Sequence, residues 1–167
     1  MYDEIPINSI DPRALRHACG SFATGVTVVT TRTRDGDHGM TVSAFMSVSL
    51  NPPLICVSLG RRSKMAGKMR DSRRFAVNIL EQNMQAHALH FAGRPDEKLT
   101  DLFEERQGMP TLRDAAALLV ADVVQQIEAG DHNLLLGQVR YLERDPEAAP
   151  LVYHVGQFGG LAQHPTR

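Results

Sequence analysis

The chain has 167 residues, 43% of them hydrophobic, which suffices for one packed domain and is too short for two. Its 18 basic and 19 acidic side chains leave a formal net charge of −1, so no broad basic field is available for a nucleic acid. We therefore expect a single domain over residues 1–167 that does not bind nucleic acid.

The N-terminal segment carries Asp3 and Glu4 and lacks the apolar stretch of a signal peptide. No run approaches the roughly 18 apolar residues of a membrane span. Cys19 and Cys56 have no CxxC spacing, so we expect two reduced and mostly buried thiols, with no disulfide or zinc site. These features predict a soluble, cytoplasmic protein with no membrane partner.

The first predicted element is a helix that begins at Asp11-Pro12, because aspartate is a good N-cap and proline suits the first helical position. The helix is expected to end just before Gly25. Apolar residues recur at helical spacing within it: Leu15, Ala18, Cys19 and Phe22.

A run of β-rich segments follows. Residues 26–31 are almost all β-branched and predict a strand. Asp35-Gly36 predicts a hairpin turn, from which a second strand returns over residues 38–44. After the break at residues 51–53, the nearly all-apolar segment 54–59 predicts a third strand that is covered on both faces.

The second half alternates short helices and strands. Ser63 is expected to begin a short helix, with Met65 and Met69 in the core. Residues 75–80 predict a strand and residues 84–91 a helix. Further elements are a short helix near 99–103, a loop over 107–114, strands over 118–128 and 134–143 joined by a turn at 129–132, and a last strand over 151–155.

These elements amount to about seven strands and three or four short helices. Hairpin-sized connections predict a mainly antiparallel sheet. Because few helices are available to cover it, such a sheet tends to close on itself. The predicted fold class is mainly β with short helices, arranged as a barrel.

Several familiar motifs are missing. No GxGxxG follows a strand, and Val26 stands where a P-loop needs lysine after the glycine spacing of residues 20–25. There is no GxSxG sequence and no outstanding pair of carboxylates. His87 and His90 have helical spacing but no acidic or cysteine residue nearby, so we expect no metal site.

The most informative segment is residues 39–53. It places four small hydroxyl residues where a strand gives way to a loop that ends in a diproline: Thr41, Ser43, Ser47 and Ser49. Backbone N–H groups and hydroxyls in such a loop can bind a phosphate or the polar edge of a flavin ring. On composition alone, an edge strand rich in serine and threonine is the simpler interpretation.

Four segments in order resemble the short-chain flavin reductases, the reductase components of two-component flavin-dependent monooxygenases. They are residues 22–30 (FATGVTVVT), residues 39–53, the strand at 75–80, and Gly130-Asp131-His132 with Gly137-Gln138-Val139. The resemblance covers about residues 13–161. Each segment alone is a weak signal, but the four in this order are specific.

The resemblance implies an FMN-binding split barrel, antiparallel and Greek-key-like, built as a homodimer with flavin near the interface. It implies that FMN or FAD binds with its isoalloxazine ring against Thr24, Gly25, Thr41, Val42, Ser43, Ala44, Ser47 and Val48. The flavin phosphate is expected near Ser58, Arg61, Ser63 and Lys64. The nicotinamide of NADH or NADPH is expected near His132, Tyr153, Gly156 and Phe158.

The residues support parts of this assignment and depart from others. Ser63 is placed to cap a helix whose N-terminus faces an anion. The alternative interpretation is that the basic residues around Ser63 form only a solvated turn. His132 follows a Gly-Asp turn, where a histidine without function is also common. Ala23 replaces the usual proline, and Ser43-Ala44 stands where the family often has Asn-Ser, which removes one polar contact.

The implied activity is hydride transfer from NAD(P)H to flavin, supplying reduced flavin to a partner monooxygenase. The cofactors carry this chemistry, and the protein stacks the two rings at roughly 3–3.5 Å, so no catalytic acid or nucleophile is needed. His132 is then an orienting residue. Two alternatives remain: an oxidase of the pyridoxamine-phosphate oxidase type on a related barrel, and a non-enzymatic flavin- or haem-binding module with His132 or His154 as axial ligand.

Overall fold

The computed structural model describes residues 9–162, so the segment with Asp3 and Glu4 lies outside the described residues. The helices within this part are α1 (Pro12–Gly20), α2 (Lys64–Ser72) and α3 (Gln85–Phe91). The strands are β1 (Thr24–Gly25), β2 (Thr27–Thr33), β3 (Gly36–Val42), β4 (Phe45–Leu50), β5 (Pro53–Gly60), β6 (Arg74–Ile79), β7 (Phe103–Arg106), β8 (Met109–Leu112), β9 (Ala117–Ala129), β10 (His132–Arg144), β11 (Val152–His154) and β12 (Gln157–Gly159). Within residues 9–162 no helix has the length and apolar character needed to cross a membrane.

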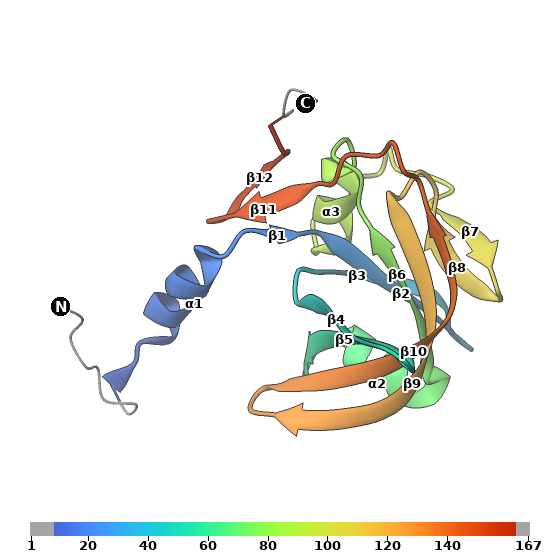
Figure 1. Cartoon of the computed structure of the whole chain (residues 1–167), viewed down its shortest axis with the longest axis horizontal. Coiled ribbons are helices and arrows are strands. Elements are labelled where there is room, and N and C mark those ends of the chain that lie inside the picture. Colours follow the sequence, from blue (N-terminus) through green and yellow to red (C-terminus); the bar gives the residue numbers. More distant parts are fainter. Residues whose placement is uncertain (1–8, 163–167) are drawn as a thin grey trace.

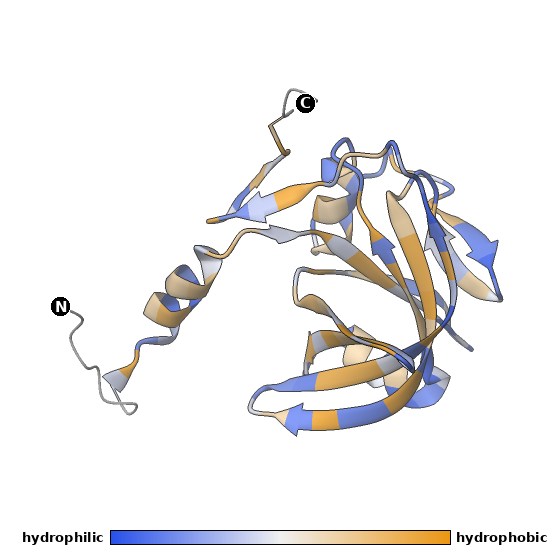
Figure 2. Cartoon of the chain, in the orientation of Figure 1, coloured by the Kyte–Doolittle hydropathy of each residue, from blue (hydrophilic) through white to orange (hydrophobic). Residues whose placement is uncertain are grey.

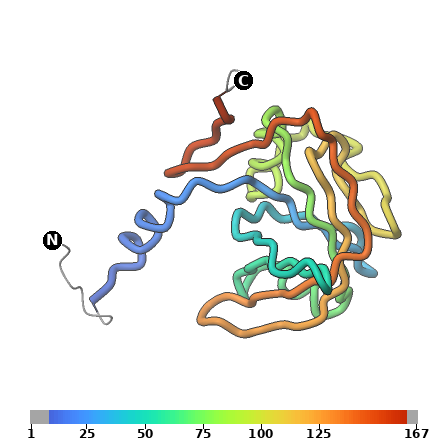
Figure 3. The backbone as a smooth tube through the Cα atoms, in the orientation of Figure 1, coloured from blue at the N-terminus to red at the C-terminus, as the bar shows by residue number. Residues whose placement is uncertain are grey.

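One large sheet organises the molecule. Its seven strands have the order β3-β2-β6-β9-β10-β5-β4, and every neighbouring pair is antiparallel. The sheet curls strongly, so that β3 and β4, at its two ends, lie on the same side of the molecule (Figures 1 and 3). The mainly β, antiparallel fold predicted from the sequence is confirmed.

The core fills the inside of this curl. Met65 and Met69 of α2 are fully buried there, as the sequence predicts, because α2 packs across the concave side. Figure 2 shows hydrophobic stretches along the central strands, whereas β7 is mostly hydrophilic. The cluster joins six strands to α2: Val29, Val42, Ile55, Val57, Leu59, Met65, Met69, Phe75, Val77, Ala121 and Leu135.

Helix α1 projects away from the sheet and buries none of its residues (Figure 1). Asp11 caps it as predicted, since its carboxylate accepts hydrogen bonds from the backbone N–H groups of Arg13 and Ala14 at 3.2 and 3.3 Å. The helix ends at Gly20, earlier than expected, because Gly25 belongs to β1, which pairs with β11. Cys19 is therefore exposed, contrary to the prediction, while Cys56 is buried.

Two segments differ from the prediction because strand pairing overrides local composition, and a third fits one of its two interpretations. Residues 45–50, a loop in the flavin-binding interpretation, form edge strand β4 against β5, as the composition-based interpretation predicted. Residues 99–103 form no helix, and the predicted loop at 107–114 contains β8, which pairs with β7. A turn with positive φ at Gln107 and Gly108 joins those two strands. The last predicted strand is a hairpin of β11 and β12.

Candidate functional site

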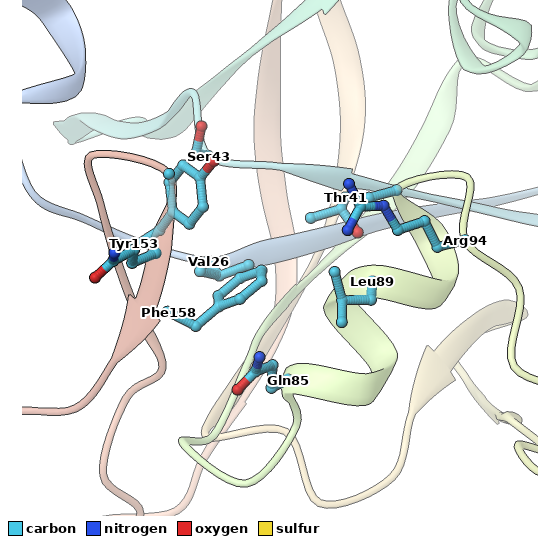
Figure 4. Close-up of a pocket in the computed structure, with 11 residues that line it drawn as sticks. Val26, Thr41, Ser43, Gln85, Leu89, Arg94, Tyr153 and Phe158 are labelled. Carbon is cyan, nitrogen blue, oxygen red and sulfur yellow. The ribbon is translucent and has the colours of Figure 1, made fainter. Parts of the chain in front are cut away.

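A cavity of about 730 Å³ lies where the β2–β3 hairpin, α3 and the β11–β12 hairpin meet (Figure 4). Its wall combines apolar side chains with a somewhat larger share of polar surface, and its volume is in the range of small-molecule sites. Its lining residues are Val26, Thr41, Ser43, Gln85, Leu89, Ala92, Arg94, Tyr153, Gly156, Gln157 and Phe158. Five of the predicted site residues are thus together: Thr41, Ser43, Tyr153, Gly156 and Phe158.

Strand β3 carries the polar side of this first cavity. Thr41 lies near the end of β3, and its hydroxyl donates a 2.7 Å hydrogen bond to the backbone carbonyl of Ala88 in α3. Ser43 follows in the β3–β4 turn and is exposed to the cavity. Figure 4 shows Ser43 and Tyr153 on one side, with Thr41, Leu89 and Arg94 on the other.

The β11–β12 hairpin forms an aromatic wall. Tyr153 and Phe158 are directly paired across it, with ring centroids 5.2 Å apart and the planes tilted by 56°. Strand β1 fixes this hairpin because Thr24 pairs with Tyr153. The hydroxyl of Thr24 is buried behind this wall without a hydrogen-bond partner. Thr24 and Gly25 therefore support the wall and do not line the cavity.

These features fit the flat, amphipathic ring of a flavin. The apolar surfaces of Val26, Leu89 and Phe158 suit the ring face, and the hydroxyls of Thr41 and Ser43 suit its polar edge. Sequence reasoning missed the wall formed by α3 and the loop after it, represented by Gln85, Leu89 and Arg94. Nothing in the local sequence pattern of residues 85–94 indicates that this helix faces β3.

A second cavity, of about 1,000 Å³, lies between the β5–α2 loop and the β9–β10 turn. The Ser63 hydroxyl caps α2 as predicted, accepting a hydrogen bond from Ala66 N at 3.1 Å. The helix N-terminus and the arginines make this cavity suited to an anion. Its lining residues are Gly60, Arg61, Arg62, Ser63, Arg70, Gln126, Glu128, Gly130, Asp131, His132 and Asn133.

Arg61, predicted near a phosphate, instead binds the β9–β10 turn. Its backbone N–H donates to the carbonyl of Asp131 at 2.9 Å, and its Nη1 donates to the carbonyl of Gly130 at 3.3 Å. Its Nη2 also lies 3.6 Å from a carboxylate oxygen of Glu128. Arg61 thus ties the β9–β10 turn to the β5–α2 loop. Within residues 9–162, Arg62 and Arg70 make no ion pair in this cavity.

His132 also lines the second cavity and is held by its neighbour. Its Nδ1 lies 2.7 Å from Oδ1 of Asp131, and this hydrogen bond lowers the pKa of the Asp131 carboxyl. Sequence reasoning singled out the histidine and not the aspartate. The signal available was the adjacency of the two residues after a turn glycine.

The remaining predicted residues are dispersed. Lys64 lines a third cavity of about 790 Å³ that shares Thr41 with the first. The side chain of Val42 is buried in the core because it faces the concave side of the sheet, so the predicted ring contact is left to its backbone. Four others lie on the β3–β4 turn, on β4 or on β5, outside all three cavities: Ala44, Ser47, Val48 and Ser58.

Comparison with known proteins gives a consistent result. Residues 19–162 match the model of the flavin reductase like domain. An NADH-dependent flavin reductase of Rhodococcus sp is 43% identical over 155 residues, covering 91% of this chain and 88% of that protein. The reductase component of 4-hydroxyphenylacetate 3-monooxygenase from Thermus thermophilus is 36% identical, covering 84% and 90%. The solved structure of flavin reductase PheA2 is 46% identical with a TM-score of 0.87, covering 92% of this chain and all of that one.

Proposed function

Because the chain belongs to the family of flavin reductase like domains, we propose that it is an NAD(P)H-dependent flavin reductase that transfers hydride from NADH or NADPH to FMN or FAD. The observation that carries the proposal is the first cavity, which joins the hydroxyl residues at the end of β3 to the aromatic β11–β12 hairpin. The names of two similar proteins, an NADH-dependent FAD reductase and an FMN reductase that uses NADH, support both the hydride donor and the flavin acceptor.

In this proposal Thr41 and Ser43 bind the polar edge of the flavin ring, and Phe158 packs against its face. Ser63, Arg62 and Lys64, around the N-terminus of α2, bind its phosphate, because Arg61 is already engaged with the β9–β10 turn. When bound, the flavin accepts the hydride that the nicotinamide releases.

The protein's contribution is then orientation. Among its described residues, the first cavity is lined by only two ionisable groups, Arg94 and Tyr153, and neither is hydrogen-bonded as a general base would be. The walls instead hold planar groups in place, which is what a near-attack arrangement of two rings requires. His132 orients the nicotinamide from the side of the β9–β10 turn.

We also propose that the protein works as a homodimer. Helix α1 buries none of its residues, and Phe22 after it is 78% exposed. The outer face of β4 adds Leu50, which is 90% exposed, together with Met46 and Val48. In Figure 1 the β3–β4 turn, β11 and the tip of the β9–β10 hairpin lie on the side from which α1 projects. A second copy on this side covers the apolar surface and brings the two cavities of opposite subunits together.

The reduced flavin is proposed to leave and serve a partner monooxygenase. Similar proteins that are named as reductase components of monooxygenases support this role. Flavin must then dissociate readily, which suits a cavity whose described polar lining consists of hydroxyl groups, two glutamine amides and a single cation, Arg94.

The decisive experiment measures oxidation of NADH and of NADPH by the purified chain, each with FMN and with FAD. We expect rapid loss of absorbance at 340 nm with at least one pair, and loss of bound flavin during gel filtration. A protein that retains flavin tightly and oxidises neither nicotinamide would instead be an oxidase of another type, and the proposal would be rejected.

A further inference from the structure

The turn between β9 and β10 presents a carboxylate and an imidazole to the second cavity. Gly130 adopts a positive φ of 59°, which places Asp131 and His132 at the start of β10. The Asp131 carboxylate is 95% exposed and yet lies 2.7 Å from Nδ1 of His132. At this distance the contact is a short, charge-assisted hydrogen bond.

This turn is not free to move away from the cavity. Both backbone and side chain of Arg61 hold it, through the carbonyls of Asp131 and Gly130. The contact between Arg61 and the β9–β10 turn also fixes the position of Nε2, the second ring nitrogen of His132. A Cβ built on Gly60 would stand 3.9 Å from Nε2 of His132, so Nε2 is directed over Gly60, at the edge of the second cavity.

We propose that Asp131 is a positioning residue that keeps the proton of His132 on Nδ1 and thereby presents Nε2 to the nicotinamide nucleotide. The assignment rests on the proposed function, because it is that function which brings a nicotinamide to His132. A carboxylate is an acceptor only, so its partner Nδ1 must carry the proton. In the Nδ1–H tautomer, Nε2 offers a lone pair, which accepts an N–H of the nicotinamide carboxamide.

Charged groups from every neighbouring element bear on this pair. Arg61 and Arg62 come from the β5–α2 loop, Arg70 from α2 and Glu128 from β9. The hydrogen bond to His132, and to a smaller extent the charge of Arg62, hold the pKa of Asp131 below its usual range. The carboxylate is therefore ionised at neutral pH, and its hold on Nδ1 persists under assay conditions.

The first test reads the tautomer directly by ¹⁵N NMR of the histidine ring at neutral pH, with the His132 signals assigned from the His132→Gln variant. We expect the wild type to carry the proton on Nδ1. In Asp131→Ala the population should shift toward the Nε2–H form, and Asp131→Asn, which keeps an acceptor oxygen, should restore the Nδ1–H form in part. An unchanged tautomer in Asp131→Ala would overturn the proposal.

The second test is kinetic. We expect Asp131→Ala to raise the KM for the nicotinamide about fivefold, with a smaller change in kcat and an unchanged flavin Kd, and Asp131→Asn to lie between it and the wild type. Asp101→Asn is the matched control, because Asp101 is exposed, pairs with Arg113 and has a φ of 51° that asparagine tolerates. A tautomer shift without any change in KM would also overturn the proposal. If the wild type neither binds nor reduces flavin, the proposed function fails, and the NMR comparison still decides whether Asp131 sets the tautomer.

Discussion

The hydroxyl of Thr41 donates a 2.7 Å hydrogen bond to the backbone carbonyl of Ala88, and this contact joins the strand that lines the first cavity to the helix opposite. Replacement by valine keeps the shape and removes the donor. We expect Thr41→Val to lower the free energy of unfolding by about 1 kcal/mol and to weaken flavin binding severalfold, because β3 and α3 are no longer held together.

Urea unfolding and titration of flavin fluorescence measure these two effects. Thr31→Val is the control, since the Thr31 hydroxyl makes a similar 2.7 Å bond to the carbonyl of Arg74, away from the cavity. It should lose stability in the same way and keep the wild-type flavin Kd. Equal loss of flavin affinity in both variants would contradict a specific role for Thr41.

His132 is expected to act on the nicotinamide and not on the flavin. Its ring lines the second cavity from the side of the β9–β10 turn, whereas the residues proposed for the flavin ring line the first cavity and those proposed for its phosphate lie across the second cavity, at the N-terminus of α2. His132→Ala should therefore raise the KM for the nicotinamide by about tenfold, the loss of about 1.4 kcal/mol of binding, with a flavin Kd within twofold of the wild type. Stopped-flow reduction with unchanged nicotinamide affinity and unchanged rate would count against this role.

The homodimer proposal predicts that a charge on the exposed apolar side breaks the assembly. Phe22→Asp and Leu50→Glu introduce carboxylates at two positions whose side chains are largely exposed to solvent in the single chain. We expect both variants to become monomers by analytical ultracentrifugation while their circular dichroism stays unchanged, and to lose flavin binding if the site forms between subunits. Leu142→Glu, on an exposed position of β10, is the matched control. A wild type that is already monomeric would refute the proposal.

The Phe75 ring packs directly on Gly137 in the core. A Cβ on Gly137 would meet two atoms of this ring at 2.6 and 2.8 Å and the Cβ of Ala121 at 2.9 Å. Because Phe75 is fully buried, it has little room to yield. We expect Gly137→Ala to lower the free energy of unfolding by about 2 kcal/mol, the typical cost of overpacking.

Gly67→Ala provides the comparison for that variant. Nothing lies within 4 Å of the added Cβ at Gly67, which sits in helix α2. There the change should raise stability by about 0.5–1 kcal/mol, through helix propensity and reduced freedom of the unfolded chain. Chemical denaturation of the two variants distinguishes crowding from a general effect of replacing glycine.

Stability should decline on the acid side through two half-buried histidines, His38 and His87. Burial, and then the charges of Lys68 and Lys64, lower the pKa of His38 from its ordinary 6.5. The unfolded chain therefore binds this proton more readily than the folded one, so stability is complete above pH 6.5 and falls as the pH drops toward the lowered folded value. Burial, and then the neighbouring His90, give His87 the same sign.

His38→Gln should remove part of this acid sensitivity. The free energy of unfolding should fall less for this variant than for the wild type when the pH is lowered from 8 to 5. His17→Gln, on the exposed helix α1, serves as control and should follow the wild type. Urea unfolding at both pH values makes the comparison, and a constant difference between His38→Gln and the wild type would contradict the prediction.

Local chemistry accounts for the features that the sequence predicted correctly. The caps at Asp11 and Ser63 depend on side chains within three residues of the helix, and the hairpins at residues 34–37 and 129–132 on their turns. The four ordered motifs predicted a flavin reductase, and the match of residues 19–162 to that family confirms it. The pairing of β7 with β8 went unrecognised, because polar or mixed segments become strands only when a partner supplies the hydrogen bonds.

The sequence alone thus determined the mainly β class and most of the elements, since periodicity, capping and turn residues act over a few positions, and its resemblance to known flavin reductases indicated the family. Only the tertiary structure decided which side chains share a cavity. Val42 turned into the core while Thr41 faced α3, and Arg61 bound the β9–β10 turn. These outcomes depend on the curvature of the sheet and on contacts between distant segments, such as Thr24 with Tyr153, which no local pattern encodes.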